Sequence, residues 1–157
     1  MELSGHSPFI VCDDVNIDNV ADIAIAAKFR NNGQVCISPN RFYIQESKKD
    51  EFVNLFVEKT KKLKIGNGMD PSTQLGPLTT KKRLNEIEEL VEKTKQEGAK
   101  VLLGGKKPAG FNKGFFYEPT VFDHVKDDFT IMKQEPFGPL VPMLSFKSFD
   151  EVIERAN

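Results

Sequence analysis

The sequence has few of the features that mark nucleic-acid-binding or membrane-spanning proteins. Its 157 residues carry a formal net charge of -1, so no excess of lysine and arginine is available to neutralise a phosphate backbone. No apolar run approaches the roughly 20 residues that span a bilayer. The N-terminus has neither the basic start nor the cleavage site of a signal peptide. These absences predict a cytoplasmic protein without a nucleic-acid or membrane partner.

Cysteine and histidine are also scarce, with two residues of each. Cys12 and Cys36 are too far apart for a metal-ligand pair and too few for a disulfide framework, so no metal site is expected and both thiols are predicted to be reduced. The remaining composition, 39% hydrophobic and 29% charged, is that of an ordinary globular domain that can bury one core.

Short apolar runs alternate with helical patterns along the chain. This alternation is typical of an α/β fold with a mostly parallel sheet. Residues 66–78 are rich in glycine and proline and are predicted to form a loop. Strands are expected at residues 8–12, 41–45 and 99–105, around 115–122, and at 140–146. Helices are expected from residue 17 to a stop at 31–33, at 47–63 and 80–97, and from about 148.

Cys36 lies on the connection that follows the first predicted helix. The partial negative charge of a helix C-terminus opposes formation of a thiolate, so the helix alone does not activate this residue. Gly33 and the polar residues around it could nevertheless present the thiol to a ligand, with the backbone N–H of Cys36 as an oxyanion donor. The residues alone leave two alternatives open, a nucleophile or a half-buried structural cysteine. Cys12 lies in an apolar run and is predicted to be structural.

Three segments resemble motifs of one enzyme family. The segment FRNNGQVC, residues 29–36, resembles the nucleophile segment of the aldehyde dehydrogenase superfamily. The start MELSGHSPFIV is similar to the family's glutamate motif, and QEPFGPLVP, residues 134–142, to its Glu-x-Phe-Gly-Pro segment. Three motifs in the family's order form a specific signal. The resemblance implies that residues 1–157 form a truncated catalytic domain, three-layered with a Rossmann-like sheet, and that the dinucleotide-binding domain is absent.

The resemblance also implies a reaction, the oxidation of an aldehyde to an acid. Cys36 would attack the aldehyde and carry a thioester, with NAD or NADP as the hydride acceptor. Glu2 would be the general base that activates water; a solvated terminal carboxylate is the alternative for this residue. Glu135 and Phe137 match positions that contact the nicotinamide ribose and ring, and Pro136 favours an extended Glu135.

Arg30 matches an arginine that binds the distal carboxylate of the substrate in the succinate-semialdehyde dehydrogenase branch, and guanidinium groups suit that task. The predicted partners are therefore a small aldehyde, possibly succinate semialdehyde, and further copies of the full-length chain. Without a bound nicotinamide the chain alone is expected to be inactive. Two other functions stay open: a non-enzymatic assembly or binding module, and a cysteine esterase or thioesterase.

Overall fold

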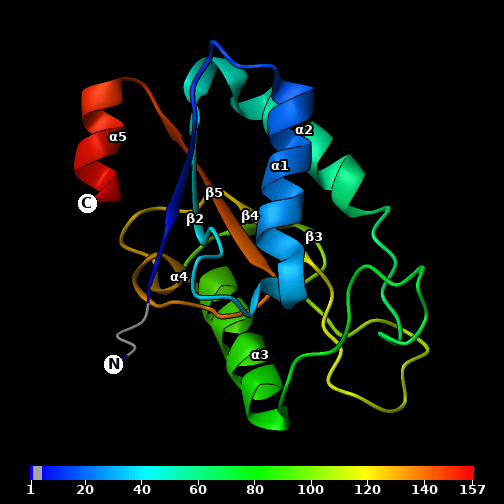
Figure 1. Ribbon diagram of the computed structural model, residues 1–157. Helices are drawn as coiled ribbons and strands as arrows, with labels where there is room; N and C mark the ends of the chain where they lie inside the picture. Colours follow the sequence, from blue (N-terminus) through cyan, green and yellow to red (C-terminus); the bar gives the residue numbers. More distant parts are fainter. Residues whose placement is uncertain (2–4) are drawn as a thin grey trace.

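The computed structural model describes residue 1 and residues 5–157. A five-stranded sheet lies between two layers of helices (Figure 1). The strand order is β1-β2-β5-β4-β3, and every neighbouring pair is parallel except β3 with β4. This arrangement confirms the predicted three-layer α/β fold. The strands are β1 (Pro8–Val11), β2 (Arg41–Gln45), β3 (Lys100–Leu103), β4 (Thr120–Asp123) and β5 (Leu140–Phe146).

The helices largely follow the sequence prediction, and side-chain caps mark the starts of three of them. The oxygen atoms of Asn16, Thr80 and Ser148 accept a hydrogen bond from the backbone N–H three residues later, as N-cap residues do. The helices are α1 (Ile17–Phe29), α2 (Lys49–Thr60), α3 (Lys81–Gln96), α4 (Thr130–Lys133) and α5 (Phe149–Ala156), with short 3₁₀ turns η1 (Arg30–Gly33) and η2 (Glu46–Lys48).

Two details of the prediction were wrong. Around residues 115–122 the described chain forms only β4 rather than several short strands, and the preceding residues run as an irregular segment. The sequence analysis also missed α4, because a helix of four residues is too short to show a helical period.

Successive side chains of the central strands point into two different cores. On β2, Phe42 and Ile44 pack against α1 and α2, whereas Tyr43 packs on the opposite side with residues of α3 and α5. Strand β5 alternates in the same way, with Met143 in the first core and Leu144 in the second. The central strands are therefore buried on both faces, as parallel strands between helices must be.

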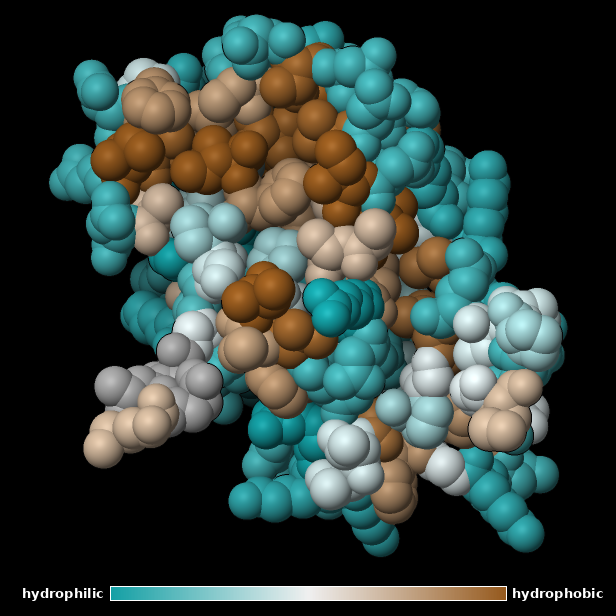
Figure 2. All heavy atoms as spheres, viewed as in Figure 1, coloured by the Kyte–Doolittle hydropathy of each residue, from teal (hydrophilic) through white to brown (hydrophobic). Residues whose placement is uncertain are grey.

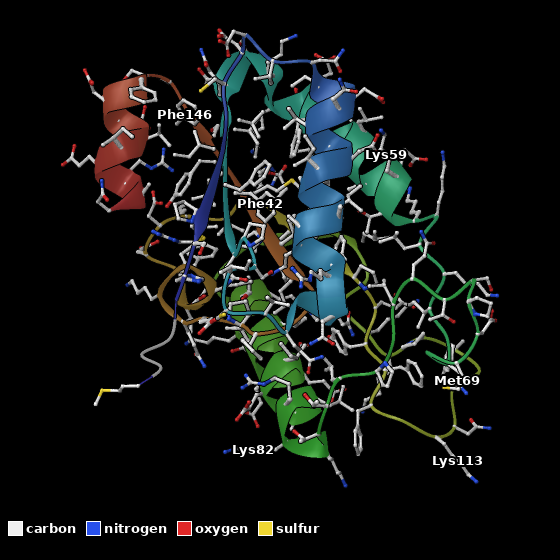
Figure 3. The ribbon with its side chains drawn as sticks, in the orientation of Figure 1. Phe42, Lys59, Met69, Lys82, Lys113 and Phe146 are labelled. Atoms are coloured by element: carbon white, nitrogen blue, oxygen red, sulfur yellow. The ribbon has the colours of Figure 1, made fainter. Side chains whose placement is uncertain are left out.

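Phenylalanine rings dominate the first core. Phe56 of α2 is fully buried, and its ring centroid lies 5.7 Å from Phe52, 5.9 Å from Phe42 and 6.1 Å from Phe29. Figure 3 shows Phe42 inside the molecule, whereas Met69 and Lys113 lie at its periphery. Aromatic contacts of this kind add to the stabilisation from burial.

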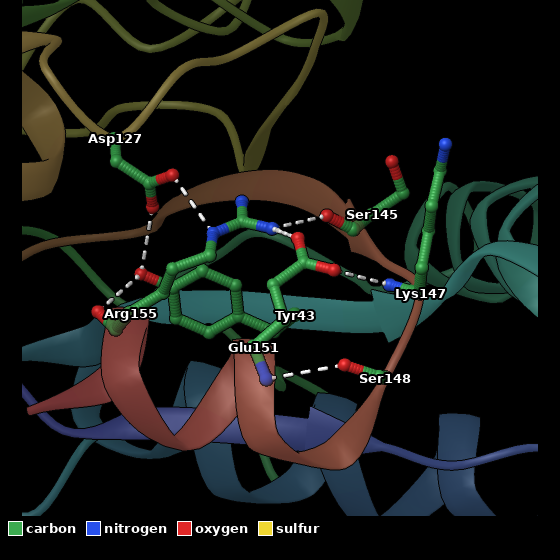
Figure 4. Close-up of polar contacts among 7 residues, drawn as sticks. All are labelled: Tyr43, Asp127, Ser145, Lys147, Ser148, Glu151 and Arg155. Carbon is green, nitrogen blue, oxygen red and sulfur yellow. Dashed lines mark hydrogen bonds and ion pairs between the residues drawn. The ribbon is translucent and has the colours of Figure 1, made fainter.

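Helix α5 is attached to the sheet through Arg155 (Figure 4). The guanidinium donates to Asp127 Oδ2 at 2.9 Å, to the Ser145 carbonyl at 2.8 Å and to Glu151 Oε1 at 2.6 Å. It also lies 5.2 Å from the ring centroid of Tyr43, whose hydroxyl donates to Asp127 Oδ1 at 3.0 Å. Burial and the neighbouring Asp127 raise the pKa of Tyr43 to about 12. This network fixes the last helix on the second core.

The start of α5 is closed by a reciprocal cap. Glu151 accepts a hydrogen bond from the Lys147 backbone N–H at 2.8 Å and donates its own N–H to Ser148 Oγ at 3.3 Å (Figure 4). This is the arrangement of a capping box displaced by one position. The pKa of Glu151 is held below its ordinary value by the Lys147 N–H and by Arg155.

Several apolar side chains remain on the surface. The exposed fractions are 60% for Ile23 of α1 and 63% and 40% for Phe149 and Ile153 of α5. Figure 2 shows apolar atoms gathered over the region between α5 and α1, where β1 forms the edge of the sheet. No helix within the described residues is long and apolar enough to cross a membrane.

Candidate active site

The chain turns sharply at the end of α1. Asn31, Asn32 and Gly33 all adopt left-handed backbone conformations, with φ of 47°, 58° and 75°. Asparagine and glycine tolerate this region better than other residues. Asn31 Nδ2 donates to the Gln34 carbonyl at 3.0 Å, and Gln34 Nε2 donates to the Asn31 carbonyl at 3.1 Å. The turn is thus closed by its own side chains.

Two side chains attach this turn to the segment before α3. Asn32 Nδ2 donates to the Gly76 carbonyl at 3.0 Å. Gln34 Oε1 accepts hydrogen bonds from the Thr79 N–H at 2.9 Å and the Thr79 hydroxyl at 2.6 Å. Both anchoring residues are buried. The segment that leads to Cys36 is therefore anchored at two residues, Asn32 and Gln34, to the segment before α3.

Cys36 lies in the next turn, which is closed by a hydrogen bond from the Ser38 N–H to the Val35 carbonyl at 2.9 Å. Ser38 is buried, and its hydroxyl is 3.4 Å from the Lys28 carbonyl of α1. The thiol of Cys36 itself is exposed. Cys36 is therefore exposed, whereas the alternative considered from the sequence was a half-buried structural cysteine; the buried residue of this turn is Ser38.

The loop before β5 packs directly on this segment. A Cβ atom placed on Gly33 would lie 2.2 Å from the Gly138 carbonyl oxygen, so the two backbones are in contact where no side chain fits. Phe137, next to Gly138, has a positive φ of 45°, which is rare for a large residue. The Asn31–Gly33 turn and the Glu-Pro-Phe-Gly-Pro loop thus form one unit.

The N-terminal segment joins the same unit through Gly5. Its backbone N–H lies 3.4 Å from Glu135 Oε2, across 130 positions of sequence. A Cβ atom on Gly5 would lie 3.2 Å from the Cys36 carbonyl oxygen. The segments that carried the family resemblance therefore meet in space, with Gly5 between the turn that contains Cys36 and the loop that contains Glu135. Glu2, the predicted general base, lies outside the described residues.

The turn that contains Cys36, the loop before β5 and the start of α3 surround an open cavity of about 870 Å³. Cys36, Glu135 and Phe137 were predicted as site residues, and all three line the cavity. The sequence analysis missed the residues that α3 contributes, because nothing in a helical pattern shows which loop lies against it. Among the described residues, the lining consists of Gln34, Val35, Cys36, Arg83, Glu86, Gln134, Glu135 and Phe137.

Arg30 and Cys12 are placed differently. Arg30 follows the last residue of α1, is exposed, and does not belong to the residues that line the cavity. Cys12 follows β1 and packs in part against the second core. Burial, together with Asp14 and Asp13, raises the pKa of the Cys12 thiol. The structure therefore separates the two cysteines into an exposed one at the cavity and a partly buried one outside its lining.

A buried lysine lies next to the turn that contains Cys36. Lys28 is fully buried, and its Nζ donates to Asn40 Oδ1 at 2.7 Å. Burial lowers the pKa of Lys28 to about 7, partly opposed by the nearby Glu135 carboxylate. His6 is also partly buried, and burial together with Arg41 lowers its pKa to about 4.

The residues at the cavity fit one edge of a nicotinamide nucleotide. Glu135 Oε1 is buried and accepts no hydrogen bond from the described residues, so it can accept one from a ribose hydroxyl. Phe137 supplies an apolar ring in the cavity wall. An acceptor beside an aromatic ring suits a ribose joined to a flat heterocycle.

Comparison with known proteins gives a single result. A family model described as "Aldehyde dehydrogenase family" matches residues 1–157. The chain is 44% identical to a protein of Sinorhizobium fredii named probable succinate-semialdehyde dehydrogenase [NADP(+)], over 99% of the chain and 31% of that protein. It is 45% identical to aldehyde dehydrogenase, cytosolic 2 of Macroscelides proboscideus, over 100% of the chain and 65% of that protein.

Solved structures agree with the sequence matches. The structure of 3,6-anhydro-L-galactose dehydrogenase in complex with NAP superimposes with a TM-score of 0.97 at 46% identity, over 99% of this chain and 33% of that one. The chain spans about a third of the length of such relatives.

Proposed function

Since this chain belongs to the aldehyde dehydrogenase family, we propose that it forms the nucleophile-bearing part of an NAD(P)-dependent enzyme that oxidises an aldehyde to the acid. Cys36 is the proposed nucleophile. Glu135 and Phe137 are proposed to contact the nicotinamide nucleotide, and Glu2 to act as general base. The residues described extend over a third of a typical relative, so the reaction belongs to the longer protein.

One observation supports this proposal above the others. The exposed thiol of Cys36, the carboxylate of Glu135 and the ring of Phe137 line the same cavity, although Cys36 and Glu135 lie in different thirds of the sequence. Gly5 touches both segments. A structural cysteine would not need an exposed position opposite a carboxylate and an aromatic ring.

The chemistry follows from these side chains. Cys36 reacts as the thiolate: its sulfur bonds to the aldehyde carbon, and the carbonyl oxygen takes over the negative charge as a thiohemiacetal anion. A nicotinamide nucleotide held by Glu135 and Phe137 would supply the hydride acceptor for this carbon, and loss of the hydride would leave a thioester on Cys36. Water then attacks the thioester and gives one proton to Glu2, the carbon–sulfur bond breaks, and the acid leaves with the Cys36 thiolate restored.

The substrate class is a finer proposal. We propose a semialdehyde whose distal carboxylate is bound by Arg30. This residue is exposed and lies directly before the Asn31–Gly33 turn that leads to Cys36. Arg30 does not line the cavity, so the proposed contact rests on the motif resemblance and on the exposure of Arg30. The similarity to the Sinorhizobium fredii protein is consistent with succinate semialdehyde. We propose a cytoplasmic homo-oligomer as the state of the full-length enzyme.

The test is acid formation by the full-length enzyme with variants at each cysteine. Cys36→Ser is expected to abolish NAD(P)-dependent oxidation, because an alcohol is a much weaker nucleophile than a thiolate. Cys12→Ser is the matched control and should retain activity. Mass spectrometry after rapid quenching should find an acyl group on the peptide that contains Cys36.

Other outcomes separate the alternatives. Ester hydrolysis that depends on Cys36, without any oxidation in the presence of NAD or NADP, would indicate the hydrolase. Activity that survives Cys36→Ser would contradict the proposed nucleophile. An unacylated Cys36 in a protein with no turnover of either kind would favour an assembly module.

A further inference from the structure

We propose that Arg83 is a positioning residue that fixes the ring of Phe137 in the wall of the cavity. The role of that ring toward the nicotinamide rests on the proposed function. The contact between Arg83 and Phe137 does not rest on the proposed function, because it is observed in the structure itself.

Arg83 lies in the first turn of α3 and reaches across to the loop before β5. Its guanidinium carbon is 5.6 Å from the centroid of the Phe137 ring, and its Nη1 is 3.4 Å from the Pro136 carbonyl oxygen. Nη1 also pairs with Glu86 Oε2 at 2.9 Å, one turn along the same helix. The Arg83 side chain is 32% exposed, so these contacts form at the open edge of the cavity.

The ring of Phe137 needs such a support. Phe137 is only partly buried, so packing does not enclose it as it encloses the core phenylalanines. The backbone after it is fixed, because Gly138 lies against Gly33 and against Ile87 of α3. The left-handed φ of Phe137 shows that this stretch of backbone is held in a conformation that a free chain avoids. The side chain of Phe137 can still rotate about its own bonds, and the flat guanidinium of Arg83 restricts this rotation.

A fixed ring has a consequence for binding. A side chain that is already ordered loses less conformational freedom when a ligand is bound. Loss of Arg83 should therefore weaken binding of the dinucleotide and slow hydride transfer. The thiol of Cys36 should be unaffected, because its turn is supported by the Ser38–Val35 hydrogen bond and by Gln34.

The first test needs no catalytic activity. The chain contains no tryptophan, so Phe137→Trp introduces a single tryptophan at the site, which can be excited apart from the two tyrosines. In this background Arg83→Met should increase acrylamide quenching of the tryptophan about twofold, because an indole ring also stacks under a guanidinium. Lys82→Met is the matched control: Lys82 neighbours Arg83, its side chain is 86% exposed, and it pairs with the same Glu86 at 3.8 Å. Figure 3 shows Lys82 on the surface, at the N-terminal end of α3.

Equal quenching in the Arg83→Met and parent proteins would overturn the proposal. An equal increase with Lys82→Met would also overturn the proposal, because quenching would then depend on the charge of α3 and not on the contact between Arg83 and the ring. Circular dichroism and urea unfolding of each variant establish that the fold is intact. If Arg83→Met does not fold, Arg83→Lys replaces it; the charge is kept but the planar guanidinium is lost, and quenching should still increase.

The second test uses the full-length enzyme. Arg83→Met should raise the KM for the dinucleotide about fivefold to tenfold and lower kcat, as expected when an oriented contact is lost. The alkylation rate of Cys36 should not change. In a Phe137→Leu background the same substitution should have little further effect, because Arg83 acts through that ring. Fully additive effects would contradict the proposal. If the parent enzyme oxidises no aldehyde, the proposed function fails, and the fluorescence test still decides the role of Arg83.

Discussion

Gly33 and Gly138 touch through their backbones, and the contact leaves no room for a side chain on Gly33. A Cβ atom there would lie 2.2 Å from the Gly138 carbonyl oxygen and 2.6 Å from its carbonyl carbon. This contact joins the turn that leads to Cys36 to the loop that carries Glu135 and Phe137. The cavity exists because these two segments are held together at this point.

The Gly33–Gly138 contact predicts that Gly33→Ala is strongly destabilising. A left-handed φ costs a residue with a Cβ about 1–2 kcal/mol, and overpacking adds about 1–3 kcal/mol. Gly110→Ala is the matched control, because Gly110 has a φ of 84° but no heavy atom within 4 Å of the added Cβ. Urea unfolding should show the larger loss for Gly33→Ala. Equal losses would mean that the loop before β5 moves away at little cost.

The two thiols should react at different rates. Cys36 is exposed, whereas Cys12 is partly buried and burial and two aspartates raise its pKa. Because the thiolate is the reacting species, iodoacetamide at neutral pH should modify Cys36 several-fold faster than Cys12 in the folded chain. Peptide mass spectrometry measures both rates, and the difference should disappear in urea. Faster reaction of Cys12 in the folded chain would contradict the exposed position of Cys36.

The buried amino group of Lys28 predicts a pH-dependent stability. Its pKa is about 7 in the folded chain and about 10.5 when unfolded, so unfolding between these values takes up a proton. Stability should therefore rise with pH in this window, by up to about 1.4 kcal/mol per pH unit, and the rise should be absent below pH 7. Lys28→Met should lack this slope, and the exposed Lys62→Met should keep it.

Urea unfolding of the three proteins at pH 7, 8 and 9 measures the slope. The other titrating groups are common to all three and cancel in the comparison. A Lys28→Met protein with the same slope as the parent would show that Lys28 remains charged in the folded chain.

The aromatic core predicts the cost of removing one ring. Phe56→Ala should lower the free energy of unfolding by about 3–5 kcal/mol, because Phe56 is fully buried and contacts three other rings. Phe149→Ala removes the same group from a side chain that is 63% exposed and should cost less than about 0.5 kcal/mol. Similar losses for the two variants would contradict the assignment of the core.

Much of the fold could be predicted from local patterns. The strands with buried side chains and the helices with polar caps at Asn16, Thr80 and Ser148 carry signals within a few residues. Helix α4 carries no such signal, because its four residues complete barely one turn. The irregular stretch before β4 contains aromatic and apolar residues that resemble a strand, but the described residues 115–119 make no ladder.

The candidate site could be predicted only in part. Cys36, Glu135 and Phe137 belong to recognisable motifs, and the structure brings them to one cavity. Arg83 belongs to no motif; it became visible only when α3 was placed against the loop before β5. The buried state of Lys28 was hidden as well, because a lysine on the last turn of a helix is normally solvated.

The strand order has a consequence for how the protein is made. Strand β5 lies between β2 and β4 at the centre of the sheet, yet it is the last of these five strands in the sequence and therefore the last of them to be synthesised. Until residue 146 has been synthesised, the β1–β2 pair and the β3–β4 pair have no common neighbour. A nascent chain therefore carries Cys36 for more than a hundred residues of synthesis before the sheet can close, and a chaperone that shields apolar strands would act during this interval.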